Sequence, residues 1–155
     1  MNKSNRIIAT GLLVFALAGL GIIGLWLFAN GKIALKPQNK RLTELGRTIY
    51  AEQCASCHGK NLEGEPNWKS QKPNGRLPAP PHDMTGHTWH HRDDLLFQLT
   101  KIGTEAVIGG DYKSDMPGFK DILDDQEIIA VLSFIKSTWP ARIQKRHDRL
   151  NQKGS

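Results

Sequence analysis

Cysteine is nearly absent from this chain of 155 residues, which contains only two. Both lie in the stretch "CASCHGKNLEG", as Cys54 and Cys57, with His58 directly after the second. A redox pair of this spacing belongs in a thioredoxin-like βαβ unit. A structural zinc site needs four closed ligands, of which two would have to be histidines. The function of the protein depends on which of these roles, or which other one, the two thiols have.

The chain also lacks strand patterns, repeats and nucleic-acid motifs, and each absence argues against a class of fold or function. No segment shows the alternation of a strand, and there are no internal repeats. No motif that reads DNA or RNA is present, and the excess charge of +6 lies at the two ends of the chain. Residues 31–141 carry 14 basic and 14 acidic side chains. These patterns exclude a thioredoxin-like fold and argue against nucleic acid as a partner.

Only one apolar run is long, the 22 uncharged residues from Ile7 to Phe28. As a helix it would span about 33 Å, enough for the hydrocarbon core of a bilayer. Lys3 and Arg6 precede it, which keeps the N-terminus in the cytoplasm. We therefore expect residues 1–30 to form a single-pass transmembrane anchor. A cleaved signal peptide is the alternative, but "FANGK" is a poor cleavage site.

The rest of the chain reads as helices joined by loops. Residues 31–41 are polar, contain Gly31 and Pro37, and predict a short tether. Apolar residues recur at helical spacing in three segments, which predict helices over about 42–53, 92–102 and 125–139. Asp124 and Glu127 are placed as in a capping box at the start of the third. Residues 141–155 form a basic tail that could bind lipid, bind a protein partner or remain disordered.

The cysteine pair with its histidine is the signature of covalent haem attachment. Two thioethers hold one edge of the porphyrin, and the next residue places an imidazole nitrogen on the iron. Attachment of this kind takes place outside the cytoplasm, in agreement with the expected anchor. The motif alone is not decisive, so its flanks matter.

Those flanks resemble a known family. The stretch "LGRTIYAEQCASCHGKNLEG" is similar to the N-terminal half of a class I c-type cytochrome, "MPGF" to its methionine loop and "EIIAVLSFIKS" to its C-terminal helix. The resemblance implies an all-α, class I cytochrome c fold around one covalent haem c, over residues 42–140. It also implies that the first and last helices cross near Gly46 and Phe134.

The resemblance further implies which residues hold the haem. Cys54 and Cys57 would form the thioethers, with His58 as proximal and Met116 as distal ligand of the iron. A thioether ligand raises the reduction potential. Met84 is an alternative distal ligand. A histidine is another, and the candidates are His82, His87, His90, His91 and His147.

The segment "LPAPPHDMTGHTWHH" departs from the common family pattern. In the family a proline carbonyl accepts a hydrogen bond from the proximal imidazole. Pro78, Pro80 and Pro81 compete for that role, and we favour Pro80. We expect Trp89 and the nearby histidines to pack around the haem edge. The alternative is that His82, His87, His90 and His91 bind a second metal.

These expectations combine into one functional hypothesis. The chain would be a membrane-anchored monohaem electron carrier, not an enzyme, in a periplasmic respiratory chain at the bacterial inner membrane. Its donor would be a quinol-oxidising complex or another protein, and its acceptor a terminal oxidase or reductase. One alternative is a fixed haem-bearing relay subunit of a larger membrane oxidoreductase. Another is a haem peroxidase, which would need an open sixth position on the iron.

Overall fold

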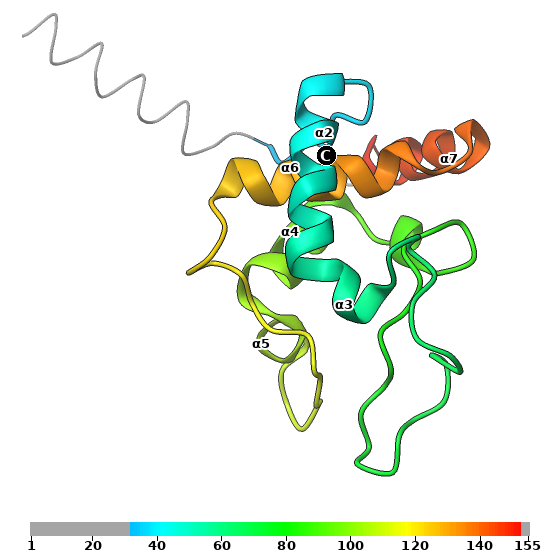
Figure 1. Ribbon diagram of the computed structural model, residues 1–155, viewed down its shortest axis with the longest axis vertical. Coiled ribbons are helices and arrows are strands. Elements are labelled where there is room, and N and C mark those ends of the chain that lie inside the picture. Colours follow the sequence, from blue (N-terminus) through cyan, green and yellow to red (C-terminus); the bar gives the residue numbers. More distant parts are fainter. Residues whose placement is uncertain (1–31, 153–155) are drawn as a thin grey trace, which may run out of the picture. The chain divides into compact units, whose positions relative to one another are not determined.

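The computed structural model describes residues 32–152. Within this range the structure is helical and contains no strand, as the sequence predicts (Figure 1). The elements in chain order are α2 (Lys40–Ile49), η1 (Tyr50–Cys54), α3 (Ala55–His58), η2 (Thr88–His90), α4 (Asp93–Ile102), α5 (Thr104–Ile108), α6 (Asp125–Ser137) and α7 (Ala141–Gln152).

The first helical segment is longer than the sequence predicts, because three elements follow one another without a loop. Asn39 begins α2 by accepting a hydrogen bond from the backbone N–H of Leu42 at 3.1 Å. The helix widens to a π-type turn at η1 and continues through α3 to His58. Such turns are frequent at functional sites. Gly59, at a φ of +81°, ends the segment directly after the histidine of the motif.

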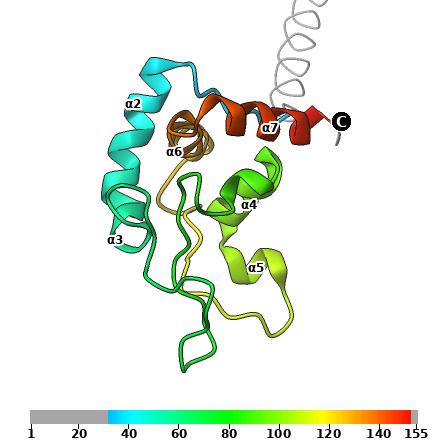
Figure 2. The ribbon, with the colours of Figure 1, turned by 90° about the vertical axis from the view of Figure 1, so that its right-hand side faces the viewer.

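The crossing of α2 and α6 forms the centre of the fold, and Figure 2, in which α6 is seen nearly end-on, shows α2 passing beside it. At Gly46 the two backbones approach so closely that an added Cβ would lie 2.0 Å from the carbonyl oxygen of Ala130. The same atom would lie 2.9 Å from Cβ of Phe134, so the predicted crossing near Gly46 and Phe134 is confirmed. The predicted capping box of Asp124 and Glu127 is also present at the start of α6.

The chain before α2 is packed onto the domain, in contrast to the free tether expected over residues 31–41. Leu35 is buried, and its backbone N–H donates to a carboxylate oxygen of Asp93 at 2.9 Å. The next N–H, of Lys36, donates to Oγ of Ser133 at 2.9 Å. Sequence patterning missed this contact because an isolated short segment has no periodicity of its own.

The basic tail also differs from a frayed end, because residues 141–152 form the docked helix α7. Ile143 and His147 are its buried side chains. Asn151 accepts a hydrogen bond from the backbone N–H of Asp93 at 2.8 Å and donates to the Asp93 carboxylate at 3.1 Å. The compact domain therefore extends at both ends beyond the expected boundaries of 42–140.

An ion pair joins α7 to α6. The ammonium of Lys136, which is buried, lies 2.7 Å from a carboxylate oxygen of Asp148. Because the lysine is removed from water, loss of Asp148 would leave a buried charge without its partner, which is costly.

None of the helices between residues 32 and 152 is long and apolar enough to cross a membrane. The expected anchor at residues 1–30 lies outside the described residues.

His147 makes the docking of α7 sensitive to pH. Its Nε2 lies 2.8 Å from the carbonyl oxygen of His91, so Nε2 carries the proton and donates. Nδ1 is buried without a hydrogen-bond partner in the described part of the chain. Burial, and then the charge of Lys136, lowers the pKa of His147, while Asp93, Asp148 and the bond to the His91 carbonyl act in the opposite direction.

We expect wild type to lose stability in acid more steeply than the variant His147→Gln. The lowered pKa means that the unfolded chain binds the proton more readily than the folded chain does. The contribution of His147 is therefore complete at neutral pH and is lost as the pH falls below about 6.5. Glutamine keeps a donor for His91 but does not titrate. Denaturant unfolding of both proteins at several pH values measures how the free energy of unfolding changes with pH. The same pH dependence in wild type and variant would contradict the prediction.

Candidate haem site

The attachment motif lies on the last turn of the first helical segment, where a tyrosine holds its end. The hydroxyl of Tyr50 donates to the carbonyl oxygens of Gly59 at 2.8 Å and of His58 at 3.2 Å. Burial raises the pKa of Tyr50, so the phenol remains a donor at any physiological pH. The backbone N–H of Gly64 binds the carbonyl of His58 as well, at 2.8 Å. The backbone around His58 is therefore fixed from two sides.

The imidazole of His58 is buried and oriented by a proline carbonyl. Its Nδ1 lies 2.9 Å from the carbonyl oxygen of Pro80. A carbonyl can only accept, so Nδ1 carries the proton and Nε2 has a free lone pair. No hydrogen-bond partner for Nε2 exists among the described residues. This is the state of a metal-binding histidine held by a second partner, and it selects Pro80 among the three prolines weighed from the sequence.

A second histidine supports the same ring. The rings of His58 and His82 are stacked with centroids 3.9 Å apart and an angle of 24° between them. Nδ1 of His82 lies 2.8 Å from Oγ1 of Thr88, and the indole N–H of Trp139 donates to the His82 carbonyl at 2.8 Å. No porphyrin fits between rings at 3.9 Å, so this arrangement excludes His82 as the distal ligand. It lies behind the proximal imidazole instead.

These supports could not be read from the sequence. Trp139 and His82 are 57 residues apart, and neither pattern nor spacing connects them. The two hydrogen bonds of Tyr50 to the motif depend on where the chain turns at Gly59.

Met116 lies on a loop that is fastened to the end of α4. The backbone N–H groups of Phe119 and Lys120 donate to the carbonyls of Thr100 and Lys101 at 3.0 and 2.9 Å. At Gly118 an added Cβ would lie 2.5 Å from the carbonyl carbon of Ile102, so only glycine allows this approach. Met116 itself is partly buried against the apolar core. The loop thus holds the methionine in place without a regular element.

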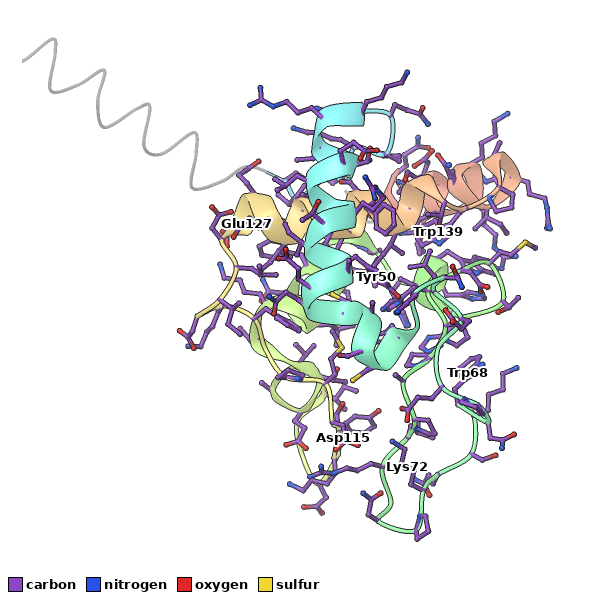
Figure 3. All side chains as sticks on the ribbon, in the orientation of Figure 1. Tyr50, Trp68, Lys72, Asp115, Glu127 and Trp139 are labelled. Carbon is purple, nitrogen blue, oxygen red and sulfur yellow. The ribbon has the colours of Figure 1, made fainter. Side chains whose placement is uncertain are left out.

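An ionic contact joins this loop to the long loop that follows the motif. Asp115, the neighbour of Met116, forms ion pairs with Arg76 and, at 3.8 Å, with Lys72. Figure 3 shows Lys72 and Asp115 side by side at the lower end of the domain. Glu65 accepts from Lys72 at 3.3 Å and from the Ala79 backbone N–H at 2.6 Å. The same carboxylates therefore link the chain next to Met116 to the chain next to Pro80.

Between these two loops lies a cavity of about 310 Å³. Its lining residues are Gln71, Asn74, Gly75, Leu77, Asp111, Tyr112 and Lys113. Neither cysteine nor His58 lines it, so it is a gap between loop tips rather than the site of the motif.

The remaining histidines do not gather into a metal site. Nδ1 of His87 and Nε2 of His91 are 3.1 Å apart, whereas His90 packs against Trp89 and His82 against His58. In the part of the chain that the structure describes, no group of three or more His, Cys, Asp or Glu residues could hold a metal ion. In the described part of the chain the four histidines therefore do not lie together as one group of ligands.

Trp89, which was expected at the haem edge, contacts its neighbour His90 and helix α7 in the structure. Its indole packs against His90 with centroids 3.7 Å apart, and the guanidinium of Arg146 lies 4.8 Å from the ring. Its N–H donates to the carbonyl of Met84 at 3.3 Å. The side chain therefore contacts α7, which the structure shows as a docked helix.

The cysteines have the chemistry of attachment points rather than of a redox pair. Both thiols are free, and Cys57 is exposed. Burial, and then Cys57, raises the pKa of Cys54 to about 11. Redox-active cysteines have lowered pKa values instead. Two free thiols one helical turn apart, beside an imidazole whose Nε2 is unpartnered, fit a covalent haem.

Comparison with known proteins agrees with this arrangement. The family model described as Cytochrome c matches residues 43–139. Neither the curated proteins nor the solved structures contain a match to this chain. The matched range is more than half of the chain and includes the motif, Met116 and the crossing helices. The chain therefore belongs to the cytochrome c family of haem-based electron carriers, with haem c covalently attached through Cys54 and Cys57.

Proposed function

We propose that the protein is a membrane-anchored, one-electron carrier whose haem iron is bound by His58 and Met116. The observation that carries the proposal is the buried His58 imidazole, with Nδ1 committed to Pro80 and Nε2 free. The haem supplies one-electron redox chemistry. The chain's own residues orient the ligands, exclude water and present a surface to partners.

The distal assignment is supported by the way the methionine loop is held. The loop is bonded to α4 and to Lys72 through Asp115, and Met116 on it is partly buried against the core. Met84, by contrast, is 39% exposed. A thioether favours ferrous iron and raises the reduction potential, which suits a carrier between a quinol-oxidising complex and a terminal oxidase or reductase.

The proposed location is the periplasmic side of the bacterial inner membrane. It is supported by the uncharged run from Ile7 to Phe28 with Lys3 and Arg6 before it. Covalent haem attachment outside the cytoplasm agrees with this orientation.

The test is a redox titration of purified full-length protein, combined with fractionation of the cells. We expect one haem per chain, a reversible one-electron transition and haem that stays with membranes through a high-salt wash. A haem that reacts with peroxide and shows a high-spin spectrum in wild type would refute the carrier role in favour of a peroxidase. Haem found in the soluble fraction would refute the membrane anchor but not the electron-carrier role.

A fixed relay subunit of a larger complex is the second candidate. The observation that favours it is α7, a docked helix that extends beyond the matched family range of 43–139. Gentle solubilisation followed by native separation decides between the two. Haem that migrates with other polypeptides supports the subunit, and haem that migrates alone supports the mobile carrier.

A further inference from the structure

The exposed side of α7 carries a stripe of basic residues that the electron-transfer role does not use. Ile143 and His147 face the core, whereas Arg142, Lys145, Arg146 and Arg149 are exposed. The four recur at the spacing of one helix face. In the described chain none of the four forms an ion pair with a carboxylate, although Asp148 on the same helix pairs with Lys136.

An aromatic side chain borders this basic stripe. Trp89 and His90 line a cavity of about 410 Å³ together with Arg146, Arg149 and Leu150. The Arg146 guanidinium lies over the indole of Trp89. Tryptophan beside basic residues is the combination found where proteins meet the headgroup region of a membrane.

The chain enters the described domain beside the same helix. Asp93 binds the Leu35 backbone N–H and also Asn151 of α7. Gln38 donates to Gln144 of α7 at 3.3 Å. Only four residues separate Phe28, the end of the apolar run, from Ile33, and this step spans at most about 18 Å. An anchored chain therefore keeps α7 close to the bilayer surface.

The stripe is also remote from the loops of the haem site. Figures 1 and 2 show α7 towards the upper end of the domain and the loop between α3 and η2 reaching its lower end. Lys72 and Asp115 lie at that lower end (Figure 3). A surface for redox partners and a surface on α7 can thus be occupied at the same time.

We propose that the basic stripe of α7 lies on anionic phospholipid headgroups, so that the helix fixes the orientation of the haem domain on the membrane. The proposal rests on the membrane anchor proposed above. Four cations without a carboxylate partner among the described residues, a bordering tryptophan and a short connection to the apolar run all lie at one helix. An acidic protein is the other occupant that the charge would suit, and the experiment separates it from lipid.

Chemical labelling of lysines in the full-length protein tests this. Protein is placed in lipid nanodiscs of phosphatidylglycerol or of phosphatidylcholine, and the acylation rate of each lysine is followed by mass spectrometry. We expect Lys145 to react about fivefold more slowly in phosphatidylglycerol, the factor that one basic residue contributes at an anionic surface. Lys60, Lys69 and Lys113, which are exposed elsewhere, should react equally in both.

Matched variants strengthen the test. Arg142→Gln/Arg146→Gln/Arg149→Gln should abolish the protection of Lys145. The control variant Lys60→Gln/Lys69→Gln/Lys113→Gln removes the same amount of positive charge and should leave the protection of Lys145 unchanged. Equal reactivity of Lys145 in both lipids would overturn the proposal and leave an acidic protein as the occupant of the stripe.

The anchor is measured separately in the same samples. Haem that remains with the discs at about 1 M salt, where the Debye length is about 3 Å, reports the apolar run alone. If the haem is released, the anchor proposal fails. The α7 proposal is then decided by sedimentation with phosphatidylglycerol vesicles at low salt, where wild type should bind and the arginine variant should not.

Discussion

Met116→Ala is expected to lower the reduction potential by at least roughly 0.1 V, within the range of about 0.8 V that axial ligands and their surroundings cover. Loss of the thioether removes the ligand that favours ferrous iron. It should also abolish the weak long-wavelength absorption of the ferric sulfur–iron bond and open the sixth position. Redox titration and the visible spectra of the oxidised and reduced protein measure both effects.

The chain contains its own matched control for this substitution. Met84→Ala removes an identical side chain from the other loop, where it is exposed, and should leave the spectrum and potential unchanged. If Met84→Ala abolishes the absorption and Met116→Ala does not, the distal assignment is wrong. Met116→His should keep a six-coordinate iron but lower the potential, which separates loss of a ligand from a change of ligand.

Gly46→Ala is expected to destabilise the protein by about 1–3 kcal/mol or more, the range of overpacked cores. Alanine normally favours a helix over glycine by about 1 kcal/mol. Here the new Cβ would lie 2.0 Å from a backbone oxygen of Ala130, which no side-chain rotation can relieve. The helices must move apart, and the core around Tyr50 and Ile128 must open. Denaturant unfolding of the holoprotein measures the free energy of unfolding.

Thr48→Ala is the control for this prediction. Thr48 is on the same helix, two residues further, and is exposed. Its replacement should change the free energy of unfolding by no more than about 0.5 kcal/mol. Equal stability of the two variants would show that the close approach of α2 and α6 does not exist in solution.

The docking of α7 explains why the structure differs from the expectations of a tether over residues 31–41 and a tail over residues 141–155. Its sequence is strongly polar, so its hydrophobic pattern is weak, and its main buried side chain is a histidine. What stabilises it is a set of specific pairings, with Asp93, Lys136 and the His91 carbonyl. Their partners lie far along the chain and have no signature in the tail itself.

The placement of Trp89 and the histidines follows from the same cause. Trp89 and these histidines lie close together in the sequence, after the attachment motif. In the structure η2 turns between them, so that His82 supports His58 while Trp89 and His90 face α7. Residues close in sequence were separated because one turn directs successive side chains to different faces.

The sequence by itself determined the attachment motif, the main helical segments and the capping of α6, which are local patterns of spacing. The family resemblance of the sequence implied the fold class and the helix crossing near Gly46. Only the tertiary structure decided which proline carbonyl binds His58, which histidine packs behind it and where the two ends of the domain dock. Those contacts join residues as far apart as Lys36 and Ser133, which are separated by 97 positions, and their energy comes from burial and hydrogen bonds that exist only once the chain has folded.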